Sequence, residues 1–164
     1  MNYGLKYERY GKNEDLYRTY EERHAEGAAR TKVVMKGIYK GRHFVIGASN
    51  IGYPVAYVEV LESDKDFINE QKECKAEAIR CVDGGSNYYG GAYWDETDPR
   101  KYLGWDYGHM DDFMGHRAMD IYDQERESKD HGHRWTLVEI LMQIAEAIME
   151  LEYEEYIHDY FRYA

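Results

Sequence analysis

The stretch Trp135–Leu151, WTLVEILMQIAEAIMEL, decides how we expect this chain to fold. Thr136 and Glu139 form the S/T-x-x-E pattern of an N-terminal capping box, and Trp135 is placed to pack onto Ile140. Leucine and isoleucine recur every three or four residues and form one continuous apolar stripe, at positions 137, 141, 144, 148 and 151. The pattern predicts a long amphipathic helix near the C-terminus that covers a sheet.

The strands of that sheet are expected upstream, where β-branched and aromatic residues gather between glycines. The segments with strand character are 33–39, 43–48, 55–61, 79–82 and 102–107. Gly41 marks a tight turn between the first two. A short surface helix is expected to begin with Asn13 as its N-cap and to end near Gly27. The charged segment 62–78 fits either a short helix at 65–73 or an irregular connection.

These elements predict an α+β fold: a small antiparallel or mixed sheet, a long C-terminal helix over it and a short N-terminal helix. A chain of 164 residues without internal repeats or a low-complexity linker indicates a single domain, 1–164, with its core at about 30–155. The tyrosine-rich tail, 152–164, is compatible with a homo-oligomer without requiring one. Met142 and Met149 fit core packing or a partner surface.

The net charge of −11 argues against direct nucleic-acid binding through phosphate neutralisation. It favours basic protein surfaces, cations or small ligands as partners, or serves solubility alone. Cys74 and Cys81 form no C-x-x-C motif, which favours reduced thiols in a cytoplasmic protein. No apolar run approaches the length of a membrane span, so we expect no membrane insertion.

The segment Cys81–Asp112 combines glycines, acidic side chains and seven tyrosine and tryptophan rings, and it predicts the functional site. Glycines let a backbone turn sharply or let a ligand approach main-chain N–H groups, and rings can stack on a planar ligand. The same residues also fit an ordinary hairpin and core packing. The predicted ligand-binding residues are Asp83, Gly84, Gly85, Tyr88, Tyr93, Trp94, Trp105, Asp106, His109 and Asp112.

Asp106, His109 and Asp112 follow one another at intervals of three residues. Carboxylates beside an imidazole can orient the ring, hold a metal or accept hydrogen bonds from a ligand. His109 is the only imidazole in this group, whereas a zinc site takes three or four ligands of this type. The sequence carries no phosphate-binding loop, dinucleotide fingerprint or nucleophile elbow. We therefore expect no cofactor, no bound metal and no catalytic residue.

Two segments resemble a family of small phage and prophage proteins. Members of that family read VHGGLTYSG and then WWxGFDxAHxGD, and the corresponding segments here are 82–90, VDGGSNYYG, and 101–112, KYLGWDYGHMDD. The likeness extends over about residues 50–155. Asp83 replaces the family's histidine, which weakens a metal site, while Ser86 and Asn87 replace its leucine and threonine. The resemblance implies a phage protein that acts in the bacterial host cell.

Three functions follow from these observations. The first is a non-catalytic phage protein that counters host defence by sequestering a nucleotide-like signalling molecule in the Gly/aromatic/Asp–His pocket. The second is an acidic inhibitor that binds a basic defence protein through charge complementarity. The third is a metal-dependent hydrolase built on Asp83, Asp106, His109 and Asp112.

Overall fold

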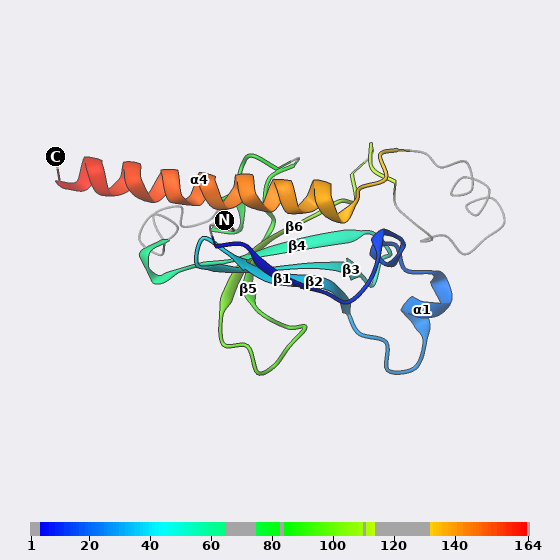
Figure 1. Cartoon of the computed structure of the whole chain (residues 1–164). Helices are drawn as coiled ribbons and strands as arrows, with labels where there is room; N and C mark the ends of the chain where they lie inside the picture. Colours follow the sequence, from blue (N-terminus) through cyan, green and yellow to red (C-terminus); the bar gives the residue numbers. More distant parts are fainter. Residues whose placement is uncertain (1–3, 65–74, 83, 110, 114–131, 164) are drawn as a thin grey trace.

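Six antiparallel strands form one sheet in the order β1-β2-β3-β4-β6-β5, and a long helix, α4, lies along one of its faces (Figure 1). The computed structural model describes residues 4–64, 75–82, 84–109, 111–113 and 132–163. The strands are β1 (Lys6–Arg9), β2 (Thr31–Tyr39), β3 (Arg42–Ser49), β4 (Pro54–Glu59), β5 (Tyr88–Gly91) and β6 (Lys101–Asp106). This architecture confirms the predicted α+β class.

The β2–β3 hairpin sets the register at the middle of the sheet. Lys40 and Gly41 form its two-residue turn, with φ of 50° and 78°, and Tyr39 pairs with Arg42. Positive φ at both turn residues matches the twist of the flanking strands, and glycine adopts it without strain. The turn predicted around Gly41 is therefore confirmed. Its register places Lys36 opposite Val45 and Ile38 opposite His43, all four on the same face of the sheet.

The helix α4 (Leu137–Tyr163) begins where the sequence predicts. The Thr136 backbone N–H donates to Glu139 Oε1, and the Glu139 N–H donates to Thr136 Oγ1, so both halves of the capping box form. The side chains that face the sheet are at most 2% exposed: Leu137, Ile140, Ile144, Ala147, Ile148 and Leu151. Each fully buried aliphatic side chain contributes about 1.5–3 kcal/mol, and this stripe fixes α4 on the sheet.

The two faces of the sheet differ in character. The face under α4 is the main core, where Phe44, Ile46, Val58 and Leu103 are completely buried. The opposite face, called here the open face, carries a smaller cluster built on Val45, Val55, Tyr57, Ala92 and Tyr102. Helix α1 (Tyr20–His24) and the connection between β5 and β6 lie on the open side in Figure 1.

The N-terminal helix expected from Asn13 is interrupted. A 3-10 turn, η1 (Asn13–Leu16), is followed by extended backbone at Tyr17, and α1 then begins after Thr19, whose side chain accepts the Glu22 N–H. Leu16 and Tyr17 are buried in the main core, and core packing therefore overrides continuation of the helix. Asn13 caps a different helix, because its Oδ1 accepts the Leu137 N–H at 2.9 Å.

Two further expectations change. The strand expected at 79–82 is wrong: Ile79 is completely buried, yet the segment has no strand pairing. Strand β1 was not expected, because its residues KYER carry no apolar alternation, and it forms by pairing with β2. The expected helix at 65–73 lies outside the described residues. Over the described parts of the chain, no helix has the length and apolar character needed to cross a membrane.

Candidate functional site

The glycine pair at positions 84 and 85 forms a tight turn. Gly84 and Gly85 have φ of 75° and 70°, and the Gly85 N–H donates to Val82 O. Ser86 closes the turn: its N–H donates to Ile79 O, and its Oγ accepts the Ile79 N–H at 3.0 Å. The Gly85 N–H is therefore used within the turn, and the turn joins no hairpin because residues 79–82 form no strand. Asp83 lies outside the described residues.

The pair His109 and Asp112 forms a junction between the end of the sheet and the start of α4. Asp112 is 5% exposed, and its Oδ2 lies 3.0 Å from the His109 backbone N and 3.1 Å from His109 Nδ1. Its other oxygen, Oδ1, accepts the Trp135 Nε1–H at 2.7 Å. Asp106 points elsewhere and accepts hydrogen bonds from the Asn87 side chain and the Gly108 N–H. The contacts of Asp112 join the segment after β6 to the residues before α4, and the contact of Asp106 with Asn87 joins β6 to the residue before β5.

Trp105 lies on the other side of the sheet from the predicted tyrosines. It is 2% exposed in the core under α4, where its Nε1–H donates to the Tyr107 hydroxyl. Tyr107 in turn donates to Gln143 of α4. Although the turn at Gly84 and the segment Trp105–His109 do lie together, the nine predicted residues within the described ranges do not line one pocket. The alternation of side chains along β6 separates Trp105 from the open face.

The predicted rings Tyr88, Tyr93 and Trp94 form an aromatic cluster on the open face with Tyr57 and Tyr102. Trp94 lies 4.4 Å from the Tyr57 ring at a 35° tilt, and edge-to-face contacts join it to Tyr93 and Tyr102. The Tyr93 hydroxyl contacts those of Tyr57 and Thr31. This cluster pins the connection between β5 and β6 across the sheet. Burial raises the pKa of Tyr57 and Tyr88, so both phenols stay neutral and can donate hydrogen bonds.

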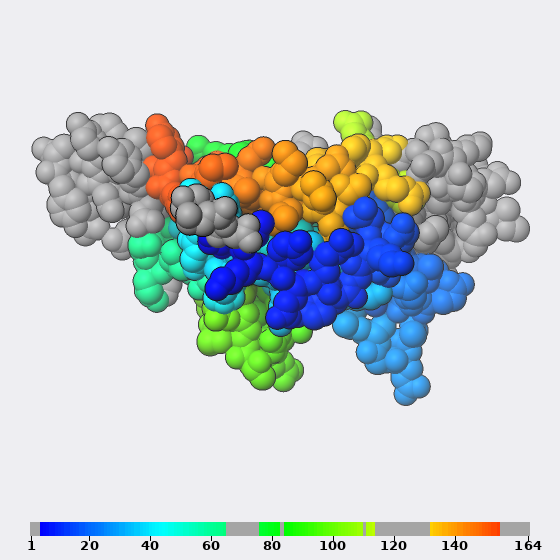
Figure 2. All heavy atoms as spheres, in the orientation of Figure 1, coloured from blue at the N-terminus to red at the C-terminus, as the bar shows by residue number. Residues whose placement is uncertain are grey.

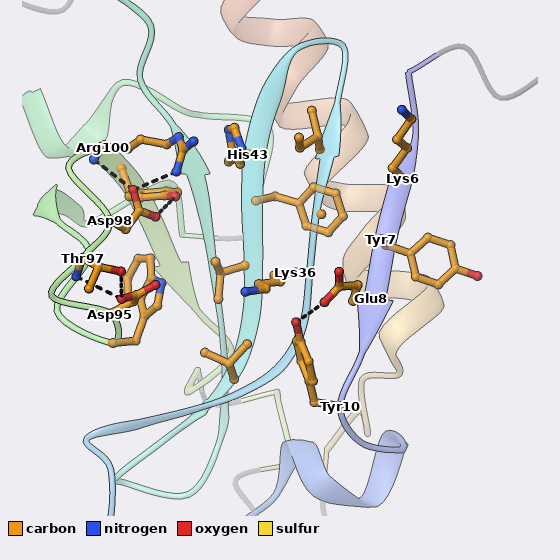
Figure 3. A pocket seen from close by; sticks show the side chains of 17 residues that line it. Lys6, Tyr7, Glu8, Tyr10, Lys36, His43, Asp95, Thr97, Asp98 and Arg100 are labelled. Carbon is orange, nitrogen blue, oxygen red and sulfur yellow. Dashed lines mark hydrogen bonds and ion pairs between the residues drawn. The ribbon is translucent and has the colours of Figure 1, made fainter.

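Beside this cluster the open face is hollowed (Figure 3). The open-face hollow has a volume of about 780 Å³ and is lined by Lys6–Glu8, Tyr10, Val33, Lys36–Ile38, His43–Val45, Trp94, Asp95, Thr97, Asp98, Arg100 and Tyr102. Small-molecule sites commonly have volumes of about 300–1,000 Å³ with a few polar groups among apolar walls. Of the nine predicted site residues that the structure describes, only Trp94 lines this hollow.

One wall of the hollow is a rigid polar network from the connection between β5 and β6. Asp98 accepts hydrogen bonds from the Tyr102 hydroxyl at 2.6 Å and from the Arg100 backbone and guanidinium, both at 3.0 Å. Although burial opposes ionisation of Asp98, these hydrogen bonds lower the pKa of its carboxyl below the ordinary value. Asp95 likewise accepts from the Thr97 N–H and hydroxyl. Both carboxylates are thus satisfied within the wall.

The opposite wall comes from β1 and the residue just after it. The Tyr10 hydroxyl donates to Glu8, which raises the pKa of the phenol. Lys36 stands on β2 between the two walls, with its Nζ 5.6 Å from the centre of the Tyr10 ring (Figure 3). Within the described part of the chain, no carboxylate lies at ion-pair distance from Lys36 or Lys6. Neither ammonium group is therefore neutralised by a direct ion pair with a described carboxylate, although Lys36 also acts on the Tyr10 phenol and on Asp95.

His43 lines the upper part of the hollow in Figure 3 and is oriented by Glu59. Glu59 Oε1 lies 2.8 Å from His43 Nδ1 and also accepts the His43 backbone N–H, while its Oε2 is 3.8 Å from Arg100. A carboxylate at Nδ1 fixes the ring and leaves Nε2 to other contacts. His43 therefore adds a directed polar group to the hollow.

Sequence reasoning missed Lys36, His43 and Tyr10 because they belong to no local motif. The signal that could have found two of them is the β2–β3 register: a turn at Lys40–Gly41 places Lys36 and His43 on one face. No sequence signal positions β1, and therefore nothing in the sequence indicated the wall that contains Tyr10.

The described residues hold no group of three or more His, Cys, Asp or Glu side chains that could bind a metal ion. Comparisons with protein-family models, with curated proteins and with solved structures find no match to this chain.

Proposed function

We propose that this chain is a non-catalytic binding protein that holds a small, planar, anionic molecule of nucleotide type in the open-face hollow. The observation that carries the proposal is the pairing, in one hollow, of the partly exposed Trp94 ring, backed by the buried Tyr102, with ammonium groups at Lys36 and Lys6. A nucleotide combines a flat base with a phosphate. The two halves of the hollow match these two parts.

The base is expected against the Trp94 ring. Stacking of a base on an aromatic side chain contributes about 1–3 kcal/mol. Trp94 is already held by Tyr57, Tyr93 and Tyr102, so little side-chain entropy is lost when a ligand binds. Because Trp94 is already held in place, a ligand can bind without rearranging this side chain.

The phosphate is expected near Lys36. Asp95, Asp98 and Glu8 remain negatively charged, but each carboxylate accepts a hydrogen bond within its own wall, so the phosphate is expected at the lysines and away from these side chains. Lys36 supplies positive charge between the walls, and Lys6 adds a second ammonium group from β1, near the upper end of the hollow in Figure 3. His43, with its Nδ1 held by Glu59, adds a directed polar group to the same hollow.

The resemblance of segments 82–90 and 101–112 to phage proteins implies that the protein acts in a bacterial host cell. In a bacterial host cell, such a protein would sequester a signalling nucleotide of a defence system and release it unchanged. The protein then acts stoichiometrically, in the cytoplasm of the host.

Calorimetric titration with a mononucleotide and with a cyclic dinucleotide tests the proposal. We expect binding that weakens about tenfold in Lys36→Ala and in Trp94→Ala, since each change removes about 1–2 kcal/mol. Lys101→Ala is the matched control: Lys101 is exposed and neighbours two lining residues, but does not line the hollow. Equal affinity in all four proteins, or a cleaved nucleotide in the cell after titration, would refute the proposal.

A further inference from the structure

Helix α4 carries a second apolar stripe on its solvent side, away from the sheet. Val138, Met142, Met149 and Tyr153 are 67%, 61%, 45% and 63% exposed, and they share one helical face with the half-buried Ala145. We call these five residues the outer stripe. Four of the eight large apolar side chains that are exposed in the described residues lie on it.

The outer stripe is accessible along the helix. In Figure 2 the orange part of α4 forms the upper margin of the molecule, with the blue N-terminal segment below it. Isolated exposed apolar residues are normal on a protein surface, whereas a contiguous apolar line is typical of an interaction surface. Methionine is over-represented at surfaces that accept helices, because its flexible thioether adapts to the partner.

The charge around the outer stripe identifies the chemistry of its partner. Between Leu137 and Glu154 the sequence has five glutamates, at positions 139, 146, 150, 152 and 154, and no lysine or arginine. Two of the five already have partners elsewhere: Glu152 pairs with Lys40, and Glu139 with His133. Glu146 is exposed, and the Glu150 side chain accepts the backbone N–H groups of Arg80 and Cys81 and forms no ion pair among the described residues. A second α4 or an anionic membrane would bring like charges together.

We infer that the outer stripe of α4 is a docking surface for a basic amphipathic helix of a protein partner. The apolar face of such a helix covers Met142 and Met149, as when two amphipathic helices pack side by side, and its lysines or arginines lie beside the glutamates. The apolar contact contributes affinity, while charge complementarity selects basic partners and speeds association. This surface is on the opposite side of the sheet from the open-face hollow and is independent of the ligand proposed there.

A fluorescently labelled peptide of leucine and lysine, patterned as an amphipathic helix, provides the probe. Its binding is followed by fluorescence anisotropy at low and high salt, with the full chain and with the double variant Met142→Ser/Met149→Ser. We expect the double variant to bind at least about tenfold more weakly, because two partly exposed apolar side chains are lost while every charge remains. Binding by the unchanged chain should weaken as salt is added.

Ile51→Ser is the matched control, since Ile51 is 48% exposed outside α4, and it should bind the peptide as the unchanged chain does. A peptide with glutamate in place of lysine should not bind. Equal affinity of the double variant and the unchanged chain would overturn the inference. So would a dimer in sedimentation equilibrium, or binding to phosphatidylglycerol vesicles, that the two methionine changes abolish.

Discussion

Gly84 lies directly against His109: a Cβ atom added to Gly84 would stand 2.6 Å from His109 Nε2. The contact joins the glycine turn, 25 residues earlier in the chain, to the junction that His109 and Asp112 form with Trp135. Only glycine suits this place, because the backbone also has a φ of 75°. Two segments singled out in the sequence are thus neighbours for a structural reason.

Gly84→Ala should therefore destabilise the protein more than a glycine change that alters the backbone alone. Gly41→Ala is the control, since Gly41 has a φ of 78° and nothing within 4 Å of an added Cβ. The control should lose about 1 kcal/mol from strain, and Gly84→Ala should lose more because His109 must also move away from Asp112. Urea denaturation measures both; equal losses would mean that the His109 contact has no energetic weight.

Asp112→Asn should destabilise the junction at the start of α4. The carboxylate accepts three N–H groups, from the His109 backbone, the His109 ring and Trp135, and an asparagine NH₂ would face at least one of those donors. We expect a loss of about 2 kcal/mol or more in the free energy of unfolding. Asp111→Asn, at the exposed neighbouring position, should change it by less than about 0.5 kcal/mol. Similar losses in the two variants would contradict this role of Asp112.

The buried ion pair between Arg42 and Asp64 should be essential for stability. The side chains are 1% and 0% exposed, and Arg42 also donates to Glu59 O. Asp64→Asn leaves a buried guanidinium without its carboxylate and should cost about 3–5 kcal/mol. Glu152→Gln removes the exposed contact with Lys40 and should cost less than about 1 kcal/mol. Thermal denaturation followed by circular dichroism compares them, and an Asp64→Asn protein as stable as Glu152→Gln would contradict the expectation.

Asp98 should make stability depend on pH in the acid range. Its pKa is lower in the folded protein than the ordinary value of 3.8 that applies to the unfolded chain. The unfolded chain therefore binds the proton first, and the stabilisation is complete above about pH 4 and is lost as the pH falls through the folded pKa. The difference in unfolding free energy between the unchanged chain and Asp98→Asn, measured by urea denaturation, should therefore decrease as the pH is lowered below about 4. A difference that does not change with pH would contradict this role of Asp98.

Much of the fold follows from local patterns in the sequence. The capping box at Thr136 and Glu139 marks the start of α4, and Gly41 marks the central hairpin, because both features depend on residues close together in the chain. Strand β1 and the end of η1 depend on distant partners: β1 pairs with β2, and Leu16 is drawn into the core. Such tertiary contacts override local propensity and leave no local signal.

The candidate site was less predictable, because its residues come from β1, β2, β3 and the connection between β5 and β6. The rings Tyr88, Tyr93 and Trp94, which the sequence assigned to a ligand pocket together with Trp105, form an aromatic cluster on the open face, and Trp94 is its link to the hollow. Side chains alternate between the two faces along β6, so Trp105 and Tyr102 lie on opposite faces of the sheet. The number of aromatic residues in a segment does not reveal which face each of them occupies.

The central claim is that the open-face hollow holds a nucleotide-type anion without changing it. The most direct measurement is mass spectrometry of small molecules released by heat from protein loaded with a cyclic dinucleotide and then freed of unbound ligand. We predict release of the intact nucleotide in near-stoichiometric amount from the unchanged chain and from Lys101→Ala, and far less from Lys36→Ala. No release from any of them, the same release from all three, or release of a hydrolysed product would contradict the account.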